Sequence, residues 1–339
     1  MQRRKALLHV GTHKTGTTSL QVFLSDNVRA LAGAGVYVPG AGRHAVGENA
    51  VTPGHHDVAW ELMSDRTESL ERAAAEGIAV DAPTIVMSSE ELHLVHTYPE
   101  RLDLLRDTLE AAGYETTIVV YLREQAGYIA SLFAELAKKN ESWRFADFLE
   151  SAFARGSFAA NPQFPIPLAY SRLLADLART FGTERVIARP YLASKDPHAL
   201  LRDFLRVVAA VHGPLELSNL NVDRALENTR ITFADVLMHV YSFVRERNPA
   251  VVDPAALALR AGIDPNDTMF GSRFSPIRYE DKVSVVRHFA ADNALVEQAA
   301  SIVLPGTRES EIAPSGDESW RLANAQRPFL DFVLNAWFR

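Results

Sequence analysis

Residues 11–20, with the sequence GTHKTGTTSL, combine two glycines with a lysine and several hydroxyl side chains. The frame G-x-x-x-x-G, followed by hydroxyl residues and set between a predicted strand and a predicted helix, is typical of phosphate-binding loops. The glycines let backbone N–H groups turn toward an anion, and the N-terminus of the following helix adds free N–H groups and the positive end of its dipole. Lys14 adds a positive charge. These residues therefore predict a loop that binds phosphate.

The lysine of this loop does not stand where nucleoside triphosphatases have it. In their pattern a lysine directly follows the second glycine, whereas here Thr17 takes that position and Lys14 comes two residues before Gly16. The sequence also offers no convincing acidic strand end for binding a metal. We therefore expect a loop that holds phosphate without an obligatory Mg²⁺.

Arg123 and Ser131 form a second pattern. Arg123 directly follows the apolar, mostly β-branched run at residues 116–122, and Ser131 lies eight residues further on, in a predicted helix over residues 125–139. A guanidinium offers paired N–H donors that suit a phosphate, and a serine hydroxyl adds a neutral donor. Ligands of open α/β sheets bind at the carboxyl ends of the strands, which is where Arg123 is expected.

Residues 14–18, Lys-Thr-Gly-Thr-Thr, resemble the K-[ST]-G-T-T loop of sulfotransferases that use 3′-phosphoadenosine 5′-phosphosulfate (PAPS). The resemblance is closest to the bacterial sulfotransferase-like proteins. It is strong over residues 5–21 and 84–139, faint over residues 189–205 and loose after residue 210. It implies that the loop binds the 5′ end of PAPS and that an arginine and a serine hold the 3′-phosphate. The cofactor-binding residues expected from it are Thr12, His13, Lys14, Thr15, Gly16, Thr17, Thr18, Arg123 and Ser131.

A base for the acceptor proton is expected near the same loop. Sulfuryl transfer to a hydroxyl or amine needs in-line alignment, a stabilised leaving phosphate and a proton acceptor. Lys14 is the candidate for stabilising the leaving group. In related sulfotransferases the base is a histidine or glutamate, often just beyond a strand, and the predicted strand at residues 84–87 leads to Glu90, with Glu91 and His93 nearby. The alternative for the two glutamates is that they merely begin a helix, where acidic residues favour the dipole.

His55 and His56 compete with Glu90 for the role of base. They open a predicted helix after the glycine-rich loop at residues 40–54, and a histidine can take up a proton near neutral pH. The alternative is that the two histidines are ordinary polar residues in the cap region of the helix.

His93 and His96 raise the question of a metal site, but the His-Glu-x-x-His pattern is missing, so no metal is expected.

Short apolar runs alternate with helix-like segments and predict an α/β fold. The predicted strands lie at residues 5–10, 36–38, 84–87, 116–122 and 185–188. The predicted helices lie at residues 17–31, 100–112, 125–139, 168–181, 199–211, 231–247, 279–289 and 294–302. This order indicates a three-layer αβα P-loop fold with a central parallel sheet and extra C-terminal helices. We expect a single domain over residues 1–339, in which the mostly helical part at residues 210–339 contributes to the acceptor site.

The composition limits the remaining possibilities. The chain has 339 residues and no cysteine, which excludes disulfides, a thiolate nucleophile and cysteine-ligated zinc. The net charge of −7 argues against a nucleic-acid partner but leaves room for a local basic pocket. No apolar stretch approaches the roughly 18 residues of a membrane span. The apolar run near the start of the chain is shorter than that of a signal peptide. Together with the resemblance, these features predict a bacterial protein located in the cytoplasm.

The predicted function is therefore that of a PAPS-dependent sulfotransferase, an enzyme acting on the hydroxyl or amine of a small-molecule or carbohydrate acceptor. Its expected catalytic residues are Lys14 and a base, either Glu90 or one of His55 and His56. Two alternatives from other classes stay open: a P-loop kinase or nucleoside triphosphatase, and a non-catalytic nucleotide-binding protein of the same fold. The sequence identifies neither the acceptor nor the oligomeric state.

Overall fold

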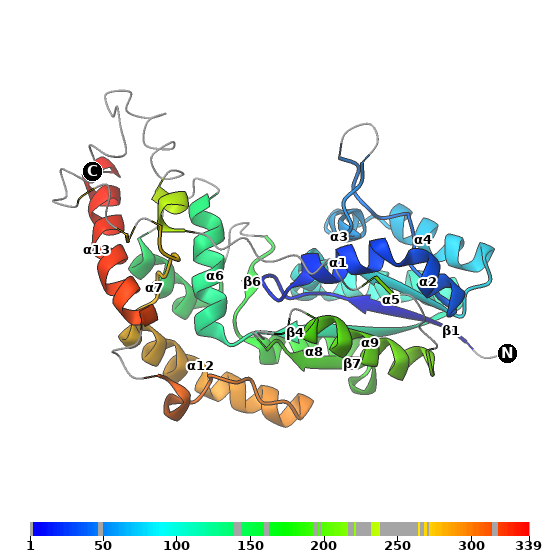
Figure 1. Cartoon of the computed structure of the whole chain (residues 1–339). Coiled ribbons are helices and arrows are strands. Elements are labelled where there is room, and N and C mark those ends of the chain that lie inside the picture. Colours follow the sequence, from blue (N-terminus) through cyan, green and yellow to red (C-terminus); the bar gives the residue numbers. More distant parts are fainter. Residues whose placement is uncertain are drawn as a thin grey trace. The chain divides into compact units, whose positions relative to one another are not determined.

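A parallel five-stranded sheet forms the centre of the N-terminal part of the chain (Figure 1). In this computed structural model its strands are β1 (Arg4–His9), β2 (Val36–Tyr37), β3 (Thr84–Ser88), β4 (Tyr114–Leu122) and β7 (Val186–Pro190). Their order is β2-β3-β1-β4-β7, and each neighbouring pair is parallel. The predicted α/β fold with a central parallel sheet is thus confirmed.

The structure describes most of the chain, in two compact units. The described residues are 3–46, 50–138, 144–158, 163–192, 196, 198–215, 220–221, 232–237, 264, 268–269, 271–313 and 318–338. The first unit comprises Met1–Arg123, Ala159–Glu227 and Asp292–Leu304, and the second comprises Glu124–Phe158, Asn228–Ala291 and Pro305–Arg339. The expectation of a single domain with a helical extension stays a prediction.

Helices pack on both faces of the sheet in the first unit. One face carries α1 (Thr17–Asp26), α2 (Val28–Gly33) and α9 (Ala199–His212), whose leucine, valine and phenylalanine side chains form a buried cluster with residues of the strands. The other face packs against α4 (Glu68–Ala79), α5 (Pro99–Ala111) and α8 (Tyr170–Phe181). Because both faces are covered, the central strands carry continuous buried apolar runs, at residues 6–8, 85–87 and 118–122, as is usual for parallel sheets. This unit also contains α3 (His56–Leu62), η1 (Glu90–Thr97), β6 (Ile166–Pro167), η2 (Thr183–Arg185) and the end of α12 (Tyr279–Ala300).

The strand order brings three loops to one edge of the sheet. β1 lies between β3 and β4, with Leu8 in register with Met87 on one side and with Ile118 on the other. Since the three strands are parallel, the segments that follow them begin at the same, carboxyl-terminal edge. Those segments carry the phosphate loop after β1, Glu90 after β3 and Arg123 after β4.

The second unit is mostly helical where the structure describes it. It contains α6 (Gln125–Lys138), α7 (Phe145–Arg155), β5 (Ser157–Phe158), η3 (Glu309–Glu311), α13 (Glu318–Phe338) and the first half of α12 (Tyr279–Ala300). Phe133, Phe145 and Phe148 are buried and contact one another at ring-centroid distances of 5.0 to 6.3 Å. Phe145 and Phe148 are therefore core residues of this unit. None of the described helices is both long and apolar enough to cross a membrane.

Two helix predictions differ from the structure. The single helix expected over residues 17–31 is divided into α1 and α2 at Asn27, whose side-chain amide donates to the carbonyl oxygens of Phe23 and Asn221. Conversely, the two helices expected over residues 279–289 and 294–302 are one continuous helix, α12. Most of the helix predicted over residues 231–247 lies outside the described residues.

Candidate functional site

The loop between β1 and α1 is hydrogen-bonded along the end of β4. The N–H of Val10 donates to the carbonyl oxygen of Val119 (3.0 Å), and the N–H of Thr12 donates to that of Tyr121 (2.9 Å). In return, the N–H of Tyr121 donates to the carbonyl oxygen of Gly11 (2.6 Å). The loop thus prolongs the β1–β4 pairing beyond the end of β1, and this pairing fixes its position.

Two threonine hydroxyls shape the loop from within. Thr12 Oγ1 donates to the carbonyl oxygen of Tyr121 (3.2 Å), and Thr15 Oγ1 donates to the carbonyl oxygen of Thr12 (2.6 Å). Both side chains are fully buried, whereas Thr18 is exposed in the first turn of α1. The hydroxyls of Thr12 and Thr15 therefore serve the loop conformation, and Thr18 offers a hydroxyl to the solvent side.

Gly16 ends the loop in a conformation that favours glycine. Its φ is +78°, and a Cβ at this position would stand 2.5 Å from Cδ2 of Leu200 and 3.6 Å from Cε2 of Tyr191. Helix α1 begins at the next residue. Gly16 has no side chain that could cap the helix, and the first turn of α1 contains no acidic residue. The positive dipole end of α1 and its first N–H groups thus have no side-chain cap, an arrangement that suits an anion.

Arg123 lies against this loop at the end of β4. Its Nη1 donates to the carbonyl oxygen of Lys14 (3.2 Å), and its Cζ lies 5.8 Å from the ring centroid of Tyr191. The hydroxyl of Tyr170 donates to the carbonyl oxygen of Arg123 (2.8 Å) and fixes the backbone there. The structure thus brings two of the predicted cationic residues, Lys14 and Arg123, to one loop.

Glu90 lies on the other side of the loop, at the start of η1. Its Oε2 accepts a hydrogen bond of 2.6 Å from Nε2 of Gln21, which is on α1. A Cβ on Gly11 would stand 3.1 Å from the Cα of Glu90, so η1 and the phosphate loop are in close contact. Ser89 caps η1 by accepting from the N–H of Glu91 (3.3 Å). Glu90 therefore both begins a helix and holds its carboxylate beside the loop.

The two neighbouring histidines have different surroundings. His55 is buried, its Nε2 donates to the carbonyl oxygen of Pro39 (3.0 Å), and its Nδ1 accepts from the N–H of Ser88 (3.2 Å). Burial, with a smaller effect of the charge of Arg43, lowers the pKa of His55 to about 4. Both ring nitrogens of His55 are thus committed to backbone groups. His56 is partly exposed and bonds Ser89 Oγ through Nδ1 (3.0 Å), which leaves its other nitrogen for an acceptor.

Two further histidines are buried beneath the loop in neutral form. Burial lowers the pKa of His9 to about 3, and its Nδ1 bonds Ser88 Oγ (2.7 Å). Burial also lowers the pKa of His93, whose Nδ1 donates to the carbonyl oxygen of Glu90 (2.5 Å). His13 contacts the ring of His93 edge to face at 5.0 Å and lies 3.4 Å from Glu91 through Nε2. Among the described residues, no three histidine, aspartate or glutamate side chains are arranged to hold a metal ion.

Ser131 lies on α6 in the second unit, whereas Arg123 belongs to the first. Ser131 is partly exposed, between the buried residues Ile129 and Phe133. Its pairing with Arg123 around one phosphate stays a prediction.

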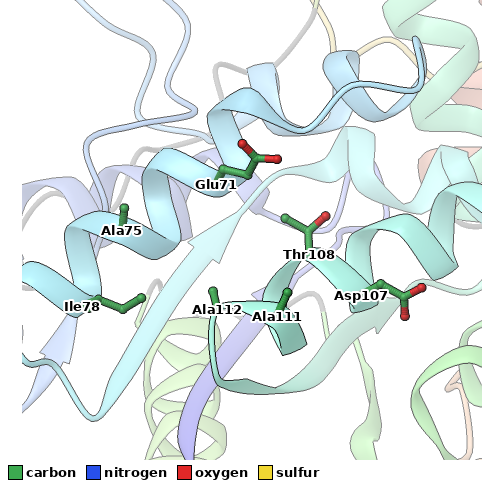
Figure 2. Close-up of a pocket in the computed structure, with 7 residues that line it drawn as sticks. All are labelled: Glu71, Ala75, Ile78, Asp107, Thr108, Ala111 and Ala112. Atoms are coloured by element: carbon green, nitrogen blue, oxygen red, sulfur yellow. The ribbon is translucent and has the colours of Figure 1, made fainter.

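A shallow groove between α4 and α5 does not have the chemistry of an anion site (Figure 2). Two carboxylates and mostly small apolar side chains line it, and none of the lining residues is cationic: Glu71, Ala75, Ile78, Asp107, Thr108, Ala111 and Ala112. A highly anionic nucleotide would be repelled by both carboxylates. The candidate site is therefore the edge of the sheet around the phosphate loop.

Sequence reasoning missed two residues of this site. Gln21 is only 2% exposed, in a helix whose other buried residues include Leu20, Phe23 and Leu24. A glutamine within such an apolar set is a signal that could have been noticed, since buried polar groups need partners. Tyr191 directly follows β7, just as Arg123 follows β4, and its position after a strand was the available signal.

Comparisons with known proteins give a likeness in structure but no match in sequence. No protein-family model and no curated protein matches the sequence. Among solved structures, the chain is similar to a sulfotransferase from Alicyclobacillus acidocaldarius, with 15% sequence identity and a TM-score of 0.47. The similarity covers 91% of this chain and 100% of that one. The case for a function therefore rests on the residues of the chain itself.

We predict that Gly16→Ala weakens the binding of 3′-phosphoadenosine 5′-phosphate (PAP) about tenfold, because the added methyl group collides with Leu200 and shifts the loop. Isothermal titration calorimetry measures the affinity. Gly113→Ala is the matched control, since Gly113 has a φ of +84° but no atom within 4 Å of the added Cβ. Both variants should lose about 1–2 kcal/mol of stability from the left-handed backbone. Equal PAP affinities in the two variants would contradict the prediction.

His55 should make stability depend on pH. Between about pH 6.5 and pH 4 the unfolded chain protonates this side chain while the folded chain keeps it neutral, so the free energy of unfolding decreases as the pH falls through that range. In His55→Gln, whose amide can serve the same two backbone groups, the decrease between about pH 7 and pH 5 should be smaller by about 2 kcal/mol. Urea unfolding at both pH values measures it. His288→Gln, at an exposed position, is the control and should keep the wild-type decrease.

Proposed function

We propose that this chain is a sulfotransferase that uses PAPS and transfers the sulfuryl group to a hydroxyl or amine of a small-molecule or carbohydrate acceptor. The observation that carries the proposal is the arrangement of three residues at one sheet edge. Arg123 Nη1 donates to the backbone carbonyl oxygen of Lys14 (3.2 Å), and Glu90 lies in η1, which follows the adjacent strand β3. Cations that stabilise the leaving phosphate and a base for the acceptor meet two of the three requirements of sulfuryl transfer, the third being in-line alignment.

The phosphate loop suits the 5′-phosphosulfate of PAPS. Gly16 takes the left-handed conformation that ends the loop, and the uncapped start of α1 offers N–H groups to an anion. When bound, PAPS supplies an activated sulfuryl group on a phosphate leaving group. In this proposal Lys14 stabilises the negative charge that develops on that phosphate, and Thr17 and Thr18 add donors. Arg123 holds the 3′-phosphate.

Glu90 is the proposed base. It accepts the proton of the acceptor hydroxyl or amine as the acceptor atom forms its bond to sulfur, and the bond from sulfur to the 5′-phosphate oxygen breaks with its electrons on the phosphate. His56 is the alternative base, since one of its ring nitrogens is not engaged by Ser89. The hydrogen bond from Gln21 to Glu90, within the same contact region as the phosphate loop, favours Glu90.

The chain should bind PAP about 100-fold more tightly than adenosine 5′-phosphate, because a guanidinium contact to the 3′-phosphate is worth about 1.5–3 kcal/mol. Arg123→Ala should remove most of this preference, as measured by calorimetry with both nucleotides. Arg101→Ala is the matched control, since Arg101 is another arginine of the first unit but pairs with Asp65 (3.0 Å). Equal affinity of the unaltered chain for the two nucleotides would reject the 3′-phosphate assignment.

Transfer itself is tested with PAPS labelled with ³⁵S and a panel of hydroxyl and amine acceptors. We expect label in at least one acceptor without added metal, and a loss of about 100-fold in kcat for Glu90→Gln with PAP affinity retained. An equal loss in His56→Gln, with Glu90→Gln unaffected, would assign the base to His56. Mg²⁺-dependent turnover of ATP without sulfuryl transfer would instead identify a kinase or nucleoside triphosphatase, and PAP binding without any transfer would identify a binding protein.

A further inference from the structure

Gln21 is a buried amide whose side chain ends at the carboxylate of Glu90. Its Nε2 lies 2.6 Å from Oε2 of Glu90, and the residue is 2% exposed. Its neighbours Leu20, Phe23 and Leu24 point into the core of the first unit. A polar side chain in this position is stable only because its hydrogen-bonding groups find partners. The Glu90 carboxylate is one such partner.

We propose that Gln21 is a positioning residue that holds the carboxylate of Glu90, in its ionised form, in the orientation from which it takes the acceptor proton. The inference rests on the proposed function as far as the proton transfer is concerned. The holding of the carboxylate itself depends only on the contact between the two side chains.

Helix α1 makes Gln21 suitable for this task. The helix starts at Thr17, directly after the phosphate loop, and Gln21 comes one turn later. Residues four apart lie on the same face of a helix, about 6 Å apart along its axis. One rigid element therefore presents both the N–H groups for the phosphosulfate and the amide for the base, so the distance between the two sites is set by the helix.

The amide of Gln21 is also confined from its other side. A Cβ on Gly54 would stand 2.7 Å from Cδ and 2.8 Å from Nε2 of Gln21, and 2.6 Å from Nε2 of His56. Only glycine leaves room there for the amide and the imidazole together. The amide therefore has little freedom to rotate away from Glu90.

The direction of the hydrogen bond favours the form of Glu90 that acts as a base. The Nε2 group of Gln21 is a donor only, and a donor stabilises an ionised carboxylate over a protonated carboxyl group. Because Gln21 engages Oε2, Oε1 is the oxygen that takes the proton from the acceptor in this proposal. The bond to Gln21 then keeps the carboxyl plane fixed while the proton moves.

Other titratable groups lie around Glu90 and must be separated from it in any pH experiment. These groups come from the phosphate loop, from α3 and from η1 itself: His13, Lys14, His56, Glu91 and His93. The titration of Glu90 is therefore to be observed directly at its own side chain rather than inferred from a rate alone.

The decisive measurement is the titration of Glu90 by NMR, in the full-length chain with ¹³C-labelled glutamate and bound PAP, with Glu90→Gln used to assign the signal. In Gln21→Met the midpoint should lie higher than in the unaltered chain, because the carboxylate has lost its donor. Gln21→Leu also removes the donor, so it should raise the midpoint in the same direction. It also serves as the second variant should Gln21→Met fold poorly.

Kinetics provide the second readout, with 2-naphthol as the acceptor probe. Gln21→Met should lower kcat about tenfold, leave KM for PAPS and the affinity for PAP within about twofold, and move the acidic limb of the kcat profile to higher pH. Asn27→Leu is the matched control, a buried amide at the end of the same helix that bonds only backbone groups in the described structure. It should lower the melting temperature without moving the Glu90 midpoint.

Two results would overturn the proposal: a Glu90 midpoint that is unchanged in both Gln21 variants, or a loss of kcat matched by an equal loss of PAP affinity. Failure of the proposed function looks different. If the unaltered chain transfers no sulfuryl group to 2-naphthol or to any member of the acceptor panel, the sulfotransferase assignment fails. The NMR midpoint still decides whether Gln21 holds the carboxylate.

Discussion

The candidate site depends on the hydrogen bonds by which the loop after β1 continues to pair with β4. Through them the N–H of Thr12 reaches the carbonyl oxygen of Tyr121 at 2.9 Å, two residues before Arg123. The loop and the arginine are therefore placed by the same backbone pairing. Arg123 closes the arrangement by donating to the carbonyl oxygen of Lys14. Without this pairing, nothing would hold Lys14, Arg123 and the start of α1 in positions from which they could bind a single ligand.

The charges of the site follow from burial. The histidines beneath the loop, among them His9 and His55, are desolvated, and burial lowers the pKa of each so that it stays neutral at physiological pH. They fill the sheet edge and bond Ser88 without adding positive charge. The permanent cations at the loop are Lys14 and Arg123. A chain with a net charge of −7 can thus present a small positive region at one edge of its sheet.

The sequence predicted the parts of this arrangement that local patterns determine. The apolar runs located the strands, and the glycine spacing located the loop between β1 and α1, because each is encoded within a few adjacent residues. Contacts between distant segments were not predictable in this way. Gln21 and Glu90 are 69 residues apart, and their contact depends on how α1 packs beside η1. Asp292 is similar: it lies within α12, where a break was expected, yet its carboxylate accepts from the N–H of Tyr170 at the start of α8.

The chemistry of residue 21 fits the demands on the proposed base, Glu90, next to the proposed anionic cofactor. A lysine or arginine there would stabilise the ionised carboxylate more strongly than an amide does, and would thereby make Glu90 a weaker base. It would also place a second cation near the phosphosulfate and so compete with Lys14 for the same charge. An apolar residue would leave the carboxylate without a donor and free to rotate. Glutamine orients the Glu90 carboxylate and adds little stabilisation of its negative charge. Because residue 21 belongs to α1, the carboxylate is oriented relative to the phosphate loop.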